Sequence, residues 1–386
     1  MATYTTTRAM FRNLKNQRKT LLKFNQNAFL RPQIGANNAR QVSGSFWQEL
    51  KPGKSMKNLC AGVGIATGLL FSSVLVKQSP RRHLLCSASA QTLVRSTTNE
   101  TGQRLLSEGD ASRLKLTLYQ YQVCPFCCKL RAFLDFYGFP YQIVEVDPIR
   151  RKEVKFSDYR KVPILVQEGQ DGKKAQMNDS SVIISALTTF MTTEEKDFQT
   201  IISYFPQIDS QSQDKKVSTE FANKYEIMKG TPGRSESEKE EKQWREWVDH
   251  VLVHYIPPNI YRSPAESIQA FSYISSQGKF NSMEKFAIKY AGAMGMFFVA
   301  KKLKKKYNLD DDVRSCLYGA ARDWTTAVGD RKFMGGEKPN LADLAVYGVL
   351  SSIEGLDAFN DMLHQTDIGS WYQRTKKAVK SHAGSR

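Results

Sequence analysis

The sequence predicts an α/β domain followed by an all-α domain, both placed behind an N-terminal membrane anchor. Three observations support this fold class. An uncharged segment spans residues 59–76, a strand-like run leads through Cys124-Pro-Phe-Cys127 into a helical pattern, and helical periodicity dominates after Val217. A length of 386 residues leaves room for two or three domains.

Positive charge is concentrated at the N-terminus. Residues 1–57 contain eleven Lys or Arg and the single acid Glu49, and residues 77–100 add a further +3, so +13 of the net +18 lies in the first 100 residues. The remaining charge is ordinary for a soluble module. We therefore expect no nucleic-acid partner.

The first 110 residues predict a targeting sequence, a membrane anchor and a linker. Residues 1–57 are basic and nearly free of acid, as in organelle-targeting presequences. The segment 59–76 would rise ~27 Å as a helix, close to the thickness of a hydrocarbon core. We predict a transmembrane anchor at 58–77, with a buried helix or a signal core as alternatives. Residues 78–110, rich in Ser and Thr, predict a linker whose cleavage could release a soluble form.

Cys124 stands where a predicted strand, 114–121, gives way to a helix. Pro125 suits the first helical position, and Gly138 suits a left-handed helix end. Between them, apolar residues at helical spacing predict a core-facing stripe: Leu130, Phe133, Leu134 and Tyr137. The helix therefore begins at the thiol.

A thiol at a helix N-terminus is favoured as the thiolate by unpaired N–H groups and by the helix dipole. We predict that Cys124 is an accessible, reactive thiol at the mouth of a groove between the two domains. Cys127 lies one turn further on and could act as a resolving thiol.

Other interpretations of the cysteines stay open. Three of the six cysteines share one motif, unlike the scattered cysteines of disulfide-stapled secreted domains. A structural zinc site needs four ligands, and the chain has no second C-x-x-C. Buried, inert cysteines are the remaining alternative. Cys128 could be an exposed helical residue without a role.

The α/β pattern continues after this helix. We predict a strand at 140–146, a helix at 149–158, a strand at 161–166 and a helix at 182–190. A cis bond at Val162-Pro163 would expose the backbone of Val162 at the domain edge. Asp179 and Ser180 could cap the second helix or offer N–H groups to a carboxylate.

The second half predicts an all-α domain, 217–386, after a polar linker, 193–216. Expected helices span 238–255, 265–276, 284–306, 313–328 and 344–356. The helix 284–306 has an apolar centre too short to cross a bilayer, so we predict it to be the central core helix. Asn340 and Asp343 form a variant of the capping box.

Two polar features of this half have open roles. His250 and His254 share a helix face at a spacing that metals use, although packing or contact with a ligand between the domains is the favoured interpretation. The lysine run at 301–306 is either a solvated face or a site for the anionic groups of a ligand.

The order of strand, Cys-Pro-x-Cys, helix, Val-Pro strand and Asp-Ser helix resembles the thioredoxin/glutaredoxin-like half of glutathione transferases. The segments "LTLYQY", "CPFC", "RAFLDFYGFPYQIVEVDP", "YRKVPILV", "NDSSVIISAL" and "GGEKPNLADLAVYGVL" resemble more closely the membrane-associated prostaglandin E synthases of that superfamily. The resemblance covers about residues 112–375. It implies a glutaredoxin-like domain at 111–192, a helical glutathione-transferase domain at 217–386, a homodimer, and isomerisation of prostaglandin H2 to prostaglandin E2.

The resemblance also implies roles for individual residues. Cys124 would be the catalytic thiol, with Tyr121 as its hydrogen-bond partner and Cys127 beside it. Glutathione and the substrate pocket would involve Phe126, Val162, Pro163, Asp179 and Ser180. Haem would be held with the glutathione thiolate as its axial ligand and with His254, Lys302 and Lys306 nearby. At positions 302 and 306 the resemblance leads us to expect arginine, and lysine cannot make arginine's two parallel hydrogen bonds to a carboxylate.

Two other functions compete with the isomerase. One is a glutaredoxin-like thiol–disulfide oxidoreductase or general glutathione transferase, and the other is a haem–glutathione binding protein without catalysis. The resemblance implies a Golgi or perinuclear membrane and a possible released cytosolic form, whereas the presequence favours mitochondria.

Overall fold

The structure is a computed structural model that describes residues 114–147, 150–169, 171–211, 217–228, 235–277, 286, 288–307 and 309–385. The predicted presequence, transmembrane anchor and linker, residues 1–110, lie outside the described residues. No helix within the described ranges is long and apolar enough to cross a membrane.

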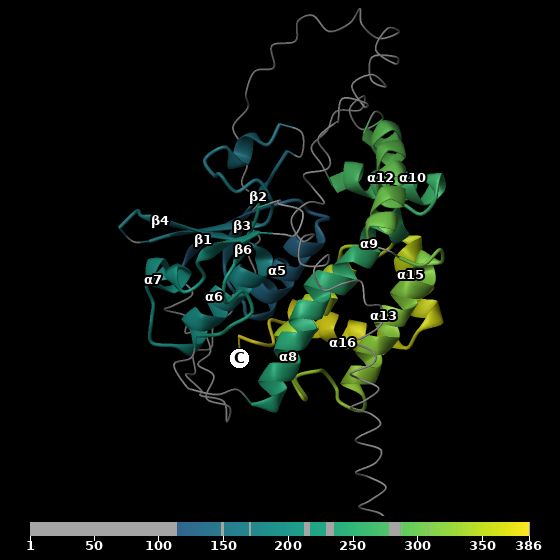
Figure 1. Cartoon of the computed structure of the whole chain (residues 1–386). Helices are drawn as coiled ribbons and strands as arrows, with labels where there is room; N and C mark the ends of the chain where they lie inside the picture. Colours follow the sequence, from purple (N-terminus) through teal and green to yellow (C-terminus); the bar gives the residue numbers. More distant parts are fainter. Residues whose placement is uncertain are drawn as a thin grey trace, which may run out of the picture. The chain divides into compact units, whose positions relative to one another are not determined.

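A four-stranded sheet forms the first domain, in the order β2-β1-β3-β4 (Figure 1). Its strands are β1 (Lys115–Gln120), β2 (Tyr141–Glu145), β3 (Ile164–Glu168) and β4 (Lys174–Asn178). β1 and β2 run parallel, and the β1–β3 and β3–β4 pairs are antiparallel. This mixed sheet confirms the predicted thioredoxin-like α/β domain.

The two faces of the sheet carry separate hydrophobic clusters. On one face, Leu116 and Leu118 belong to the large cluster that includes helices α5 (Pro125–Phe136) and α6 (Ser180–Thr192). On the other face, Ile164 and Val166 belong to a smaller cluster. The alternation of side chains along a strand explains the division, and the smaller cluster contains the Cys-Pro-Phe-Cys thiols.

The helical domain contains helical segments at each predicted position, with shifted ends, and two further helices after residue 356 that were not predicted. Its helices are α8 (Glu236–Trp247), η2 (Val248–Leu252), α9 (Val253–Ile260), α10 (Pro264–Gln277), η3 (Ile288–Gly292), α12 (Ala293–Lys306), α13 (Val313–Val328), α14 (Leu341–Ser351), α15 (Asp357–Gln365) and α16 (Ile368–Lys380). The predicted capping box at the start of α14 is confirmed: the Asn340 side chain accepts from the Asp343 N–H, and Asp343 accepts from the Asn340 N–H.

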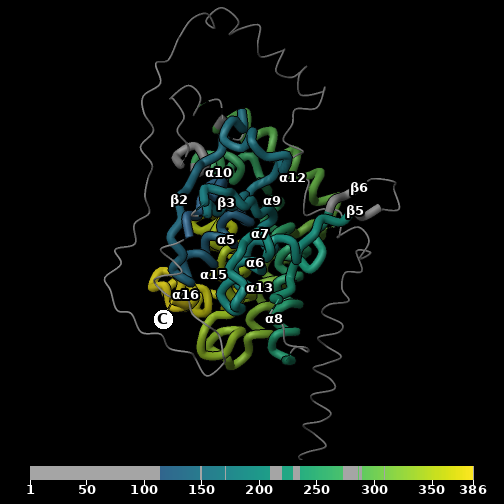
Figure 2. The backbone as a smooth tube through the Cα atoms, turned by 90° about the vertical axis from the view of Figure 1, so that its left-hand side faces the viewer, coloured from purple at the N-terminus to yellow at the C-terminus, as the bar shows by residue number. Residues whose placement is uncertain are grey.

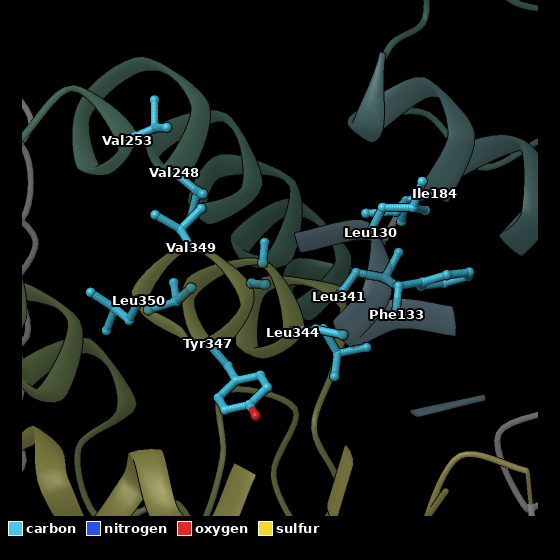
Figure 3. Packing of buried hydrophobic residues seen from close by; sticks show 14 of the residues in the cluster. Leu130, Phe133, Ile184, Val248, Val253, Leu341, Leu344, Tyr347, Val349 and Leu350 are labelled. Atoms are coloured by element: carbon cyan, nitrogen blue, oxygen red, sulfur yellow. The ribbon is translucent and has the colours of Figure 1, made fainter. Parts of the chain in front are cut away.

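Helix α14 joins the two domains by lying directly against α5. A Cβ placed on Gly348 of α14 would sit 2.4 Å from Cα of Lys129 on α5, so the two backbones touch where no side chain fits. Leu130 and Phe133 of α5 lie beside Leu341 and Leu344 of α14 (Figure 3). The helix that carries the thiols is therefore fixed by the second domain.

Several predicted elements differ from the observed ones. The helix expected at 149–158 is reduced to a 3₁₀ turn, Lys152–Val154. The linker expected at 193–216 contains helix α7 (Phe198–Ser203) and strand β5 (Gln207–Gln211), which pairs with β6 (Val217–Phe221). These strands are largely polar, so hydrophobic periodicity could not indicate them. Strand β4 was missed for the same reason.

The predicted central core helix was misplaced. Along η3 and α12, Tyr290, Met294 and Phe298 are 42%, 41% and 60% exposed. Both Figure 1 and Figure 2 show α12 beside α10. The helix surrounded by core is instead α14, in which every residue from Leu341 to Leu350 is buried. The apolar composition of residues 290–300 led to the prediction of a buried helix, but composition does not show which faces of a helix pack against other elements.

Candidate active site

Cys124 occupies the N-cap position of α5, as predicted. Its backbone is extended (φ −72°, ψ 123°), its carbonyl accepts from the Cys128 N–H at 2.8 Å, and Pro125 is the first helical residue. Its side chain makes no capping hydrogen bond to the helix backbone. Gly138 ends the helix with φ +68°, also as predicted.

The expected accessibility of Cys124 is wrong, because the side chain is 0% exposed. The sulfur belongs to the small cluster with Val154 and Val162, and the half-buried rings of Phe126 and Tyr159 pack against that cluster. A substrate therefore reaches the sulfur only after one of these neighbouring groups moves.

Two protonated groups surround this thiol. Burial raises the pKa of Cys127 well above its usual value, and a side-chain hydrogen bond to Cys124 and the negative charge of Cys124 raise it further. Burial likewise raises the pKa of Tyr121 to about 12, with the charges of Cys124 and Cys127 adding to the effect and Arg151 opposing it. At neutral pH the site therefore holds the S–H of Cys127 and the phenol O–H of Tyr121 close to the Cys124 sulfur.

Cys128 is buried rather than exposed. Its sulfur lies 3.5 Å from the Gln122 carbonyl oxygen and accepts from Nη2 of Arg131 at 3.1 Å. Burial raises the pKa of Cys128, and the nearby Arg131 guanidinium opposes that shift. The charge of Cys124 adds to the upward shift in the pKa of Cys128, so the third thiol is electrostatically near the first.

The predicted ligand-binding loop has unusual geometry at two points. The Val162-Pro163 peptide bond is cis, as the sequence indicated. Asp179 caps α6 by accepting from the Ser181 N–H at 2.9 Å, yet its φ of +68° is rarely adopted by a residue with a side chain. Such conformations cost about 1–3 kcal/mol and concentrate at functional sites.

Positive groups surround Asp179. Nζ of Lys224 lies 2.9 Å from Oδ2 of Asp179. Burial lowers the pKa of Lys161, and the charge of Asp179 counteracts this. Tyr159 links the two halves of the site, because its pKa is raised first by burial and then by the charges of both Asp179 and Cys124. The charges of Cys124 and Asp179 therefore both act on the Tyr159 hydroxyl.

A buried ionic network behind α5 was not predicted. Nζ of Lys129 lies 2.5 Å from Oδ1 of Asp249 and donates to Oγ of Ser181 at 2.8 Å. The same carboxylate accepts from Ser181 and from the Tyr225 hydroxyl, at 2.7 and 3.0 Å. Lys129 is a charged residue among the apolar residues of α5. This was the one feature of the sequence that could have indicated a buried ion pair here.

The histidines lie near this network, His250 directly after Asp249 and His254 in the following helix α9. Asp249 and His250 sit in η2, a π-helical turn of the kind that often marks functional sites. Nδ1 of His250 and Nε2 of His254 are buried without a hydrogen-bond partner, and His254 stacks on Tyr307 at 4.3 Å. Within the described residues, no group of three or more His, Cys, Asp or Glu side chains could hold a metal ion.

The two lysines expected beside a cofactor are both exposed. Lys306 is near enough to lower the pKa of His254, although burial is the larger cause and His250 also contributes. No contact of Lys302 with the histidines or the thiols is found in the part of the chain that the structure describes.

Sequence relatives identify the family. The chain is 51% identical over 277 residues to "Prostaglandin E synthase 2" of Mus musculus, covering 70% of this chain and 72% of the relative. It is 50% identical over 285 residues to the protein of the same name from Danio rerio, covering 71% and 74%. The chain belongs to the prostaglandin E synthase 2 family. Residues 118–189 of this prostaglandin E synthase 2 family member also match the family described as "Glutathione S-transferase, N-terminal domain".

Solved structures are more distant from this prostaglandin E synthase 2 family member. A serine-to-cysteine mutant of poplar glutathione transferase F1 is 14% identical, covers 70% of this chain and 98% of its own, and has a TM-score of 0.37. Rice GST1 in complex with glutathione is 15% identical, covers 70% and 90%, and has the same TM-score. The fold assignment therefore rests on the strand order and on the glutathione S-transferase match.

Proposed function

We propose that Cys124 carries the prostaglandin E synthase activity of this family, the isomerisation of prostaglandin H2 to prostaglandin E2. One observation carries the proposal. A thiol at the N-terminus of α5 is flanked by two groups, Cys127 and Tyr121, whose raised pKa values keep them protonated at neutral pH. The site thus offers a nucleophile together with proton donors.

The proposed reaction breaks the weak O–O bond of the endoperoxide. The Cys124 thiolate attacks one ring oxygen, an S–O bond forms, and the other oxygen leaves as an alkoxide that takes a proton from Tyr121. The Tyr121 phenolate then removes the hydrogen from the carbon that bears the sulfur-bound oxygen. The C–H electrons form the ketone, the S–O bond breaks, and the thiolate returns. Atoms and electrons balance, so no external oxidant or reductant is needed.

The raised pKa of Tyr121 suits both halves of this cycle. A phenol with a pKa of about 12 stays protonated until an alkoxide forms, and its conjugate base is then strong enough to take a proton from carbon. Cys127 contributes by donating its S–H to the Cys124 sulfur, which stabilises the negative charge between turnovers.

The residues around Asp179 fit glutathione. Its α-amino group would pair with the Asp179 carboxylate, and its γ-glutamyl carboxylate would face Lys161, Lys224 and the N–H groups that begin α6. The backbone of Val162, before the cis bond, would pair with the peptide of glutathione. When bound, glutathione would supply a second thiol near the endoperoxide.

The described residues do not form a haem cradle. Lys302 and Lys306 are exposed, and only Lys306 is electrostatically near His254. No step of the mechanism passes through haem. A Soret band formed by the purified protein with glutathione and micromolar haem would support the alternative of a haem–glutathione binding protein.

Product analysis tests the proposal. Cys124→Ser should abolish formation of prostaglandin E2 from prostaglandin H2 while the folded spectrum and melting curve stay unchanged. Cys316→Ser, on the distant α13, is the matched control and should keep full activity. Wild-type rates in Cys124→Ser would show that the thiol is incidental.

A thiol–disulfide oxidoreductase is the second candidate, because Cys124 and Cys127 share a hydrogen bond in a C-x-x-C motif. Cys127→Ser separates the two functions. A reductase would lose turnover of protein disulfides, whereas the isomerase would keep most of its activity because a serine hydroxyl can still donate to the Cys124 sulfur.

We further propose that residues 58–77 anchor the chain in a Golgi or perinuclear membrane, with mitochondria as the alternative, and that the enzyme acts as a homodimer. The uncharged segment with basic flanks supports the anchor. Fractionation and imaging of the tagged full-length chain would test the membrane, and light scattering would test the dimer.

A further inference from the structure

Helix α12 and the π-turn before it expose an unusual row of large apolar side chains. Phe286, Tyr290, Met294 and Phe298 are 67%, 42%, 41% and 60% exposed. They follow one another at intervals of four residues, with Phe286 just before the π-turn. We call these four residues the apolar row.

The helix geometry explains why the row stays on one side. Side chains four apart drift around an α-helix of 3.6 residues per turn, but the wider π-helical turn of η3 keeps them closer to one line. Phe286 and Tyr290 accordingly have ring centroids 4.7 Å apart. The first two members of the apolar row are therefore in direct contact.

The opposite side of the helix is packed. A Cβ on Gly292 would lie 2.4 Å from the Phe271 ring of α10. Ala293, Met296, Ala300 and Leu303 are buried at helical spacing. This buried face already packs the helix against the rest of the domain. Packing among the described residues therefore does not explain why the side chains of the apolar row are apolar.

The charged side chains on this helix are all positive, and acidic residues begin only after its end, at Asp310–Asp312. Residues 286–307 contain six lysines and no Asp or Glu. Nζ of Lys301 lies 4.4 Å from the centroid of the Phe297 ring, and Nζ of Lys289 lies 5.5 Å from that of Tyr290. Lys304 pairs with Asp311, while Lys301 and Lys305 are exposed on the side of Phe298.

We propose that the face formed by the apolar row and its lysines docks on the surface of an anionic membrane. Aromatic and Met side chains flanked by lysines are the pattern of helices that lie in the interface plane, with lysines on headgroups and apolar side chains below them. Uniform positive charge opposes a two-fold contact with a second copy, which would bring two sets of lysines together. This face is separate from the predicted anchor at 58–77.

Such docking would place the C-terminal end of α12 near the lipid. Tyr307, directly after that end, stacks on His254, and His254 follows the segment that carries Asp249. The helix that carries His254 would then contact the membrane-bound helix α12 through Tyr307. A fatty-acid-derived substrate could enter from the bilayer.

A fluorescence experiment on the full-length chain tests the proposal separately from the anchor. Phe298→Trp places a reporter in the apolar row, and Phe156→Trp places one at another exposed aromatic position, 56% exposed, in the first domain. Each variant is bound to phosphatidylcholine/phosphatidylserine vesicles whose acyl chains carry bromine, and the wild-type emission is subtracted.

The proposal expects quenching of the Phe298→Trp emission and none of the Phe156→Trp emission. Adding Lys301→Gln and Lys305→Gln should weaken docking of the face about 30-fold, since each basic residue near an anionic surface contributes about fivefold. Three outcomes would overturn it: no quenching of Phe298→Trp on membrane-bound protein, equal quenching of both reporters, or a concentration-dependent blue shift of Phe298→Trp without vesicles, which would indicate a second copy.

Discussion

Lys129 and Asp249 form an ion pair in which Nζ lies 2.5 Å from Oδ1 and both side chains are 1% exposed. Lys129 comes from the helix that begins at Cys124, and Asp249 comes from the π-turn of the helical domain. Burial opposes charge on Asp249, but the charges of Lys129 and Lys224 hold the pKa of its carboxyl well below the usual range. The pair therefore fixes the thiol helix to the second domain.

Removing one partner of this ion pair should lower the free energy of unfolding more than removing both charges. Lys129→Met leaves the buried carboxylate without its nearest cation, and we expect a loss of about 3–5 kcal/mol in the free energy of unfolding. Urea denaturation of Lys129→Met, Asp249→Asn and the double variant measures the coupling. In the double variant the asparagine can still bond Ser181 and Tyr225, so its loss should be smaller than the sum of the two single losses. Strictly additive losses would contradict the pairing.

Close contact of the α5 and α14 backbones gives a second prediction. Gly348→Ala would place a methyl group against Cα of Lys129, and backbone atoms cannot turn aside as a side chain can. We expect a destabilisation of about 1–3 kcal/mol and a lower turnover, because α5 carries Cys124.

Gly319→Ala is the matched control for that change. Gly319 also lies inside a helix, α13, but a Cβ there meets no atom within 4 Å. This variant should be more stable than the wild type by roughly 0.5–1 kcal/mol, since alanine is the better helix former. Equal effects at the two positions, measured by thermal unfolding, would exclude the close contact as the cause.

The sequence predicted those features that depend on local chemistry. Cys124, Pro125 and Gly138 each have a residue-specific backbone preference, and the helix they define was predicted to within a residue. The same holds for the capping box of Asn340 and Asp343, in which two side chains only three residues apart satisfy each other's backbone. These signals are read from neighbours in the chain.

Features that depend on distant parts of the chain were not predicted. The burial of Cys124 comes from Val154, Val162 and other groups that the fold brings over it. The exposure of Phe298 depends on which face of α12 packs against the rest of the domain. Asp249 looked like an ordinary polar residue because its partner, Lys129, lies 120 positions away. Composition and hydrophobic periodicity indicate whether a segment is a helix or a strand. They do not show which other segments pack against it.

The burial of Cys124 predicts low reactivity toward alkylating reagents. Cys316 is half-exposed, so iodoacetamide followed by peptide mass spectrometry should modify it before Cys124. Phe126→Ala removes a ring that packs against the thiol cluster, and it should speed alkylation of Cys124 by about tenfold, the effect of roughly 1.4 kcal/mol of lost shielding.

Phe156→Ala serves as the control for that experiment. Its ring is exposed and lies at a tilt against Tyr119, with a centroid distance of 5.0 Å. It should leave the rate at Cys124 unchanged. Rapid alkylation of Cys124 in the wild type would mean that the site opens without help from Phe126.

The buried imidazole of His254 gives a pH-dependent prediction. The pKa of His254 is lowered to about 4, chiefly by burial, with His250 and Lys306 acting in the same direction and Asp249 opposing them. The unfolded chain binds this proton below about pH 6.5, while the folded chain does so only below about pH 4. Stability from this residue is therefore full at neutral pH and is lost progressively as the pH falls through that window, by up to roughly 3 kcal/mol.

Replacing the titratable ring isolates this contribution from that of other groups. His254→Phe keeps a ring to stack on Tyr307 but cannot bind a proton, so its unfolding free energy should fall less between about pH 7 and about pH 4.5 than that of the wild type. His364→Phe, at an exposed position of α15, should follow the wild-type curve. Urea denaturation at both pH values measures the difference. If His254→Phe lost as much stability on acidification as the wild type, the imidazole would have to be already solvated and free to take up its proton in the folded protein.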